Sequence, residues 1–76
     1  MYHDAANTYE LTTAEKSLIA YALRIASRGS VTQREEFEQI HGSLSGCLDD
    51  MMDAAIICGH PAIAAQLARA LARLTA

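Results

Sequence analysis

The chain has 76 residues, of which 51% are apolar and 20% charged, a composition typical of one small globular domain. Its net charge of −3 disfavours nucleic acid and acidic membranes as partners. No apolar run approaches the roughly 20 residues that span a bilayer, and the polar N-terminus is unlike a secretory signal. We therefore expect a cytoplasmic protein that does not associate with membranes.

Residues 1–10 show no hydrophobic period, so we predict a flexible leader there and a single helical domain over 11–76. The pattern Thr12-x-x-Glu15 predicts a capping box that starts a first helix, which ends near Arg28 before Gly29. The predicted apolar face holds Ala14, Leu18, Tyr21, Ala22 and Ile25, widened by Ile19, Leu23 and Ala26. The opposite, basic side carries Lys16, Arg24 and Arg28.

A second, short helix is predicted to begin at either Ser30 or Thr32, because each opens a capping-box pattern. It should end near His41, before Gly42. The side chains expected to point inward are Val31, Phe37 and Ile40.

A third helix is predicted from Leu44 to Cys58, capped by Ser43. Its apolar arc contains Leu44, Cys47, Leu48, Met51, Met52, Ala54, Ala55 and Cys58. Its polar arc contains Ser45, Gly46, Asp49, Asp50 and Asp53. Ile57 falls among the aspartates, which leaves two interpretations open: it packs beneath the next helix, or it is an exposed anchor for a partner.

A fourth helix is predicted from Pro61 to about Leu74, since proline suits the first helical position. Its expected core stripe is Ile63, Leu67, Ala70, Leu71 and Leu74. A second arc of small residues, Ala64, Ala65, Ala68 and Ala72, would let another helix approach closely, and we take it as a homodimer interface. The simpler alternative is that alanine is an excellent helix former that tolerates exposure.

Together these elements predict an all-α fold, a homodimeric bundle of four short helices with a helix-turn-helix-like pair in the middle. In such a pair the second helix enters the major groove of DNA. Here that helix would present three aspartates to the phosphates, so we do not expect it to bind DNA directly. A dimeric DNA-binding regulator that uses the basic side of the first helix remains the alternative.

The sequence contains no motif that would support catalysis or hold a cofactor. Cys47 and Cys58 would lie about 16 Å apart along one helix, too far for a disulfide. No CxxC or HxxxH spacing is present, so no metal site is expected. We predict a protein that is not an enzyme.

The charges are distributed unevenly, because residues 30–58 hold six acids and a single base. These acids predict a docking face for a partner protein with a basic surface, although a merely solvated face has the same composition. The predicted partner-binding residues are Glu35, Glu36, Glu38, Asp49, Asp50, Asp53 and Ile57.

In size, acidity and lack of an enzymatic motif, the chain is similar to small phage- or mobile-element-encoded proteins that inhibit a host protein, such as anti-CRISPR proteins and transcription-factor antagonists. The resemblance involves no particular residues. It implies a regulator or inhibitor that binds a protein, with a structural assembly subunit as a further alternative.

Overall fold

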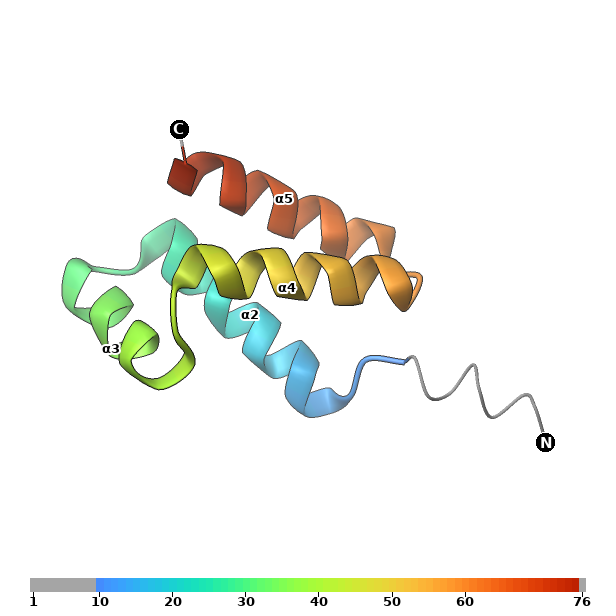
Figure 1. Ribbon diagram of the computed structural model, residues 1–76, viewed down its shortest axis with the longest axis horizontal. Coiled ribbons are helices and arrows are strands. Elements are labelled where there is room, and N and C mark those ends of the chain that lie inside the picture. The colour runs from blue at the N-terminus through green and yellow to red at the C-terminus, as the bar shows by residue number, and fades with distance from the viewer. Residues whose placement is uncertain (1–9, 76) are drawn as a thin grey trace.

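The structure, a computed structural model, describes residues 10–75, and over this range it is all-helical, with four helices and no strand (Figure 1). The helices are α2 (Thr13–Arg28), α3 (Val31–His41), α4 (Leu44–Ile57) and α5 (Pro61–Thr75). The expected all-α class and helix number are thus confirmed. The leader predicted over residues 1–10 lies, apart from Glu10, outside the described residues.

Side-chain caps explain where the first three helices begin. The Thr12 box is present as predicted: the Glu15 amide donates to the Thr12 hydroxyl at 3.0 Å and the Thr12 amide donates to the Glu15 carboxylate at 2.8 Å. The bond from the Thr12 amide to the carboxylate, and secondarily the nearby Thr12 hydroxyl, hold the pKa of Glu15 below its usual value. For α3 the cap is Ser30, not Thr32, and Ser43 caps α4.

The helices pack so that α4 and α5 form an antiparallel pair with the most extensive contact in the fold, and α2 lies against both (Figure 1). The shorter α3 contacts α2 and α4 but not α5. The largest fully buried side chains come from α3, α4 and α5, and they are Phe37, Leu44, Leu48 and Leu67. The core therefore forms where α4 meets the other three helices.

The prediction that Val31 and Ile40 point inward is wrong, because each is 76% exposed. Only Phe37 of α3 is buried. Residues nine apart lie on opposite sides of a helix at about 100° per residue, so one narrow contact face cannot bury both. The prediction for α2 also fails at Ala14, which is exposed in the first turn.

α3 is attached to the bundle by an aromatic contact and a hydrogen bond. The Phe37 ring lies 5.5 Å from the Tyr21 ring and 4.7 Å from the His41 ring, measured between centroids. The Leu44 amide donates to the Glu38 carboxylate at 2.8 Å, which ties the side of α3 to the start of α4. A short helix with one buried side chain depends on these contacts for its position.

The end of α4 excludes one of the two interpretations of Ile57. The helix runs through Ile57, Cys58 caps it, and Gly59 then takes a positive φ of 77° that reverses the chain. Because the helical twist persists to its last residue, Ile57 stays on the aspartate side and is 66% exposed. The interpretation that it packs beneath α5 is wrong.

Among the described residues, none of the helices is both long enough and apolar enough to cross a membrane.

Candidate functional site

The outward side of α4 combines acidic and large apolar side chains, and we call it the α4 outer face. At about 100° per residue, its members fall within roughly a third of the helix circumference. All of them are exposed, and they are Asp49, Asp50, Asp53, Ile56 and Ile57. Three carboxylates thus lie along the helix, and two isoleucines lie at its C-terminal end.

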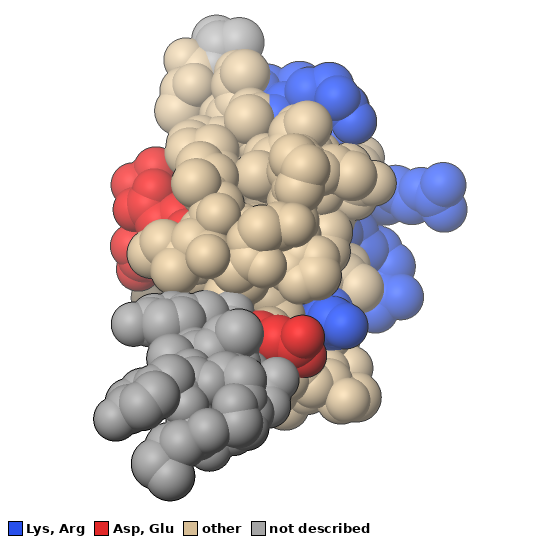
Figure 2. All heavy atoms as spheres, turned by 90° about the vertical axis from the view of Figure 1, so that its right-hand side faces the viewer, with Lys and Arg blue, Asp and Glu red and all other residues tan. Residues whose placement is uncertain are grey.

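The carboxylates of this face have no basic partner in the described part of the chain, where the single ion pair joins Arg34 and Glu38. Figure 2 shows Lys and Arg gathered along one side of the molecule and most of the visible acidic groups on the other. A further acidic group lies beside the lowest cation in that view. The negative field of the α4 outer face is therefore available to a partner.

The acids of α3 do not all join this face. Glu38 is half-buried and is used within the fold, since it accepts from the Leu44 amide and lies 3.6 Å from the Arg34 guanidinium. Glu36 lines a pocket between α2 and α3, and Glu35 is exposed on α3. Of the seven residues predicted to bind a partner, four lie together on α4, and they are Asp49, Asp50, Asp53 and Ile57.

Ile56 is a member of this face that the sequence analysis missed. It is 60% exposed. A signal was present, because Ile56 falls about 20° from Asp49 on the helical wheel and hence outside the apolar arc. Because Ile56 also lies next to the apolar arc, its position on the wheel is equally consistent with a core residue.

The small-residue arc predicted as a homodimer interface is divided by the fold. Ala64 is 8% exposed and belongs to the core of its own chain, so its assignment to an open dimer face is wrong. The reason is that Ala64 lies only about 20° from Leu71 of the core stripe on the helical wheel, at the edge of the buried side of α5. Ala65, Ala68 and Ala72 remain exposed.

Both cysteines are free and partly buried on the apolar side of α4. The Cys47 thiol donates to the His41 carbonyl at 3.2 Å. Burial raises the pKa of the Cys47 thiol, and the negative charges of Asp50 and Glu38 raise it further. Cys47 is thus held in the protonated form, which disfavours a nucleophilic role.

This arrangement predicts how Cys47 reacts. In a Cys58→Ser background, Asp50→Asn should make Cys47 react about twofold faster with an aromatic disulfide reagent near pH 8, because removing a negative neighbour lowers the thiol pKa and increases the thiolate fraction. The rate at which the Cys47 thiol reacts with the reagent is measured by absorbance at low salt. Asp53→Asn removes the same charge from another position on the helix and should change the rate less. Equal acceleration by both variants would contradict the specific effect of Asp50.

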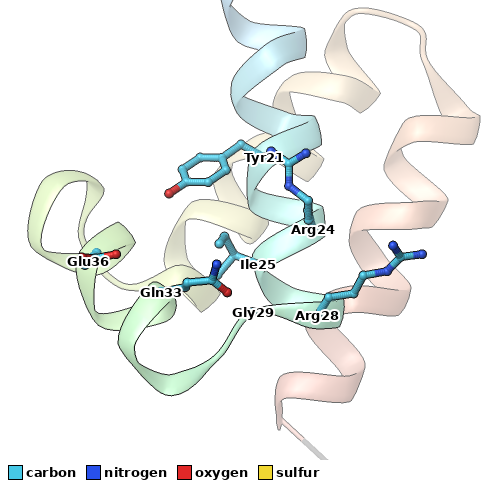
Figure 3. A pocket seen from close by; sticks show the side chains of 7 residues that line it. All are labelled: Tyr21, Arg24, Ile25, Arg28, Gly29, Gln33 and Glu36. Atoms are coloured by element: carbon cyan, nitrogen blue, oxygen red, sulfur yellow. The ribbon is translucent and has the colours of Figure 1, made fainter.

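The pocket between α2 and α3 has a volume of about 350 Å³ and is lined by residues of mixed charge (Figure 3). Arg24 and Arg28 come from α2, and Glu36 and Gln33 come from α3. The Arg28 side chain points away from α3 in Figure 3. No cluster of three His, Cys, Asp or Glu side chains that could bind a metal occurs within residues 10–75. The predictions of no enzymatic activity and no cofactor stay predictions.

Comparisons of the chain with protein-family models, with curated proteins and with solved structures find no match.

Proposed function

We propose that the protein is a regulator or inhibitor that binds a partner protein with a basic surface through the α4 outer face. The observation that carries this proposal is the exposure of Ile56 and Ile57 directly beside three carboxylates that form no ion pair with any residue of 10–75. Large apolar side chains cost free energy when they stay in water, and an exposed apolar group bordered by charge is typical of a docking surface.

The two kinds of side chain have different parts in such an interface. The isoleucines would enter a shallow apolar depression on the partner and provide affinity through buried area. Asp49, Asp50 and Asp53 would face lysines or arginines around that depression, steering encounter and excluding acidic surfaces. Binding of this kind weakens as salt screens the charges.

The test measures the contributions of the isoleucines and of the aspartates to binding separately. The tagged protein captures its partner from a lysate of the organism that encodes it, and affinity is then measured with the purified partner. Asp49→Asn with Asp53→Asn should weaken binding about tenfold and flatten its salt dependence. Ile57→Ser should weaken binding at least about tenfold while the salt dependence stays the same.

The matched control is Glu10→Lys, which changes the net charge by the same two units but leaves α4 and the predicted partner-binding residues intact. This control should bind like the wild type, and all variants should retain their helical circular dichroism. Wild-type affinity in both α4 variants, or equal weakening by the control, would show that the surface is assigned wrongly.

The expectations of a homodimer, of a helix-turn-helix-like pair and of an anti-host role stay predictions. Ala65, Ala68 and Ala72 are exposed and could contact a second copy, which would support a homodimer or an assembly subunit. The interpretation of α3 and α4 as a helix-turn-helix-like pair is supported by their contact and by the short connection between them. The anti-host role still rests on size, acidity and lack of an enzymatic motif.

A further inference from the structure

A shallow groove of about 350 Å³ lies between α2 and α5, away from the α4 outer face. It is lined by Leu23 and Ser27 of α2 and by Gln66, Arg69 and Arg73 of α5. The two arginines are one helical turn apart and both are exposed. No carboxylate lines the groove.

Two further arginines lie on α2 next in sequence to residues that line this groove. Arg24 and Arg28 directly follow Leu23 and Ser27, so they lie about 100° further round α2, where they line the neighbouring α2–α3 pocket together with Glu36. The Arg24 guanidinium lies 5.8 Å from the centre of the Tyr21 ring, and the Arg28 side chain points away from α3 (Figure 3). Neither takes part in the single ion pair given for residues 10–75.

We define the α2–α5 cationic face as these four arginines with the two polar side chains between them: Arg24, Arg28, Arg69, Arg73, Ser27 and Gln66. Figure 2 shows the Lys and Arg atoms along one side of the molecule, opposite most of the visible acids. The local field on this side is therefore positive even though the whole chain carries −3.

We propose that the α2–α5 cationic face binds duplex nucleic acid through its phosphate backbone, without reading bases. Arginine forks match phosphate oxygens in pairs, and Ser and Gln side chains are common donors to the same oxygens. The groove supplies the Arg69 and Arg73 guanidinium groups and the Gln66 side-chain amide side by side, while the Ser27 hydroxyl donates to the Arg24 carbonyl within α2.

The apolar side chains argue against an acidic protein as the occupant. The large apolar residues that are exposed in the described part of the chain, Val31, Ile40, Ile56 and Ile57, all belong to α3 and α4. The cationic face thus has charge and hydrogen-bond donors but no large exposed anchor of the kind that protein interfaces use.

A single strand is also disfavoured as the occupant. Its binding depends on exposed aromatic rings on which bases stack. The aromatic residue nearest this face, Tyr21, is half-buried, with its ring 5.5 Å from that of Phe37.

The sequence alone argues against nucleic-acid binding, because the basic side of the first helix holds only Lys16, Arg24 and Arg28 and the net charge of the chain is negative. Folding adds Arg69 and Arg73, more than 40 positions away in the chain, to the same side as Ser27. Asp49, Asp50 and Asp53 meanwhile lie on the outer side of α4, and Glu36 lines the α2–α3 pocket beside Arg24 and Arg28.

The experiment measures fluorescence anisotropy of a labelled, mixed-sequence DNA duplex titrated with the full chain at several salt concentrations from about 20 to 200 mM. The variant is Arg69→Gln with Arg73→Gln. The matched control is Thr32→Glu with Gln39→Glu, which lowers the net charge by the same two units at exposed positions of α3. Circular dichroism confirms that each protein is folded.

We expect the wild type and the control to bind with similar affinity. The arginine variant should bind at least about tenfold more weakly at the lowest salt, and the slope of log K against log salt should become shallower by about 1.8. No binding by the wild type at the lowest salt, or equal binding by variant and control, would overturn the proposal. Displacement of the duplex by polyglutamate at equal charge concentration would overturn it in favour of an acidic protein.

Discussion

Replacing Phe37 with Ala is expected to lower the free energy of unfolding by about 3–5 kcal/mol and to release α3 from the bundle. Phe37 is fully buried and is the only buried side chain of α3. Its ring contacts Tyr21 from α2 and His41 from its own helix. An isolated helix of this length is not stable in water, so α3 should lose its helical structure once the contact is gone.

Urea unfolding followed by circular dichroism measures this effect. Ile40→Ala is the matched control on the same helix, because Ile40 is 76% exposed and its truncation should change the unfolding free energy by less than about 0.5 kcal/mol. A comparable loss in both variants would mean that α3 packs through Ile40 as well, as its apolar character alone suggests.

Leu67→Ala is expected to lower the free energy of unfolding by about 2–5 kcal/mol. Leu67 is fully buried, and α5 makes its most extensive contact with α4. The truncation leaves a cavity in a small core that has few other side chains to close it. Because small domains have a total stability on the order of 5 kcal/mol, a loss of this size should lower the melting temperature strongly.

Thermal melts of Leu67→Ala and of its control Ile57→Ala check this prediction. Ile57 is 66% exposed, so the control should melt close to the wild type. A stable Ile57→Ala protein would also show that the α4 outer face can be altered without loss of the fold. A marked drop in its melting temperature would instead indicate that Ile57 supports the fold.

The two proposed surfaces lie on different helices and can be tested separately. Variants of the α4 outer face should leave DNA binding nearly unchanged, and Arg69→Gln with Arg73→Gln should leave the affinity for a protein partner nearly unchanged. If both surfaces bind, the chain brings a protein and a nucleic acid together.

Local sequence signals determined the helices and most of their limits. The Thr12 box, the Ser43 cap, Pro61 and Gly59 act through hydrogen bonds and backbone preferences that span only a few residues. The core stripe of α5 was likewise readable, because Leu67 and Ala70 recur at helical spacing and both are buried.

The tertiary structure alone decided which of several local options is used and which distant residues meet. Ala64 turns into the core and Ile40 is left outside, because the position of a helix against its neighbours selects among faces that are locally equivalent. Ser27 and Arg69 line the same groove through the packing of α2 on α5, a proximity of distant segments that no local spacing encodes. The sequence thus determined which residues share a face of each helix. Which of these faces is buried was determined by the helix that packs against it.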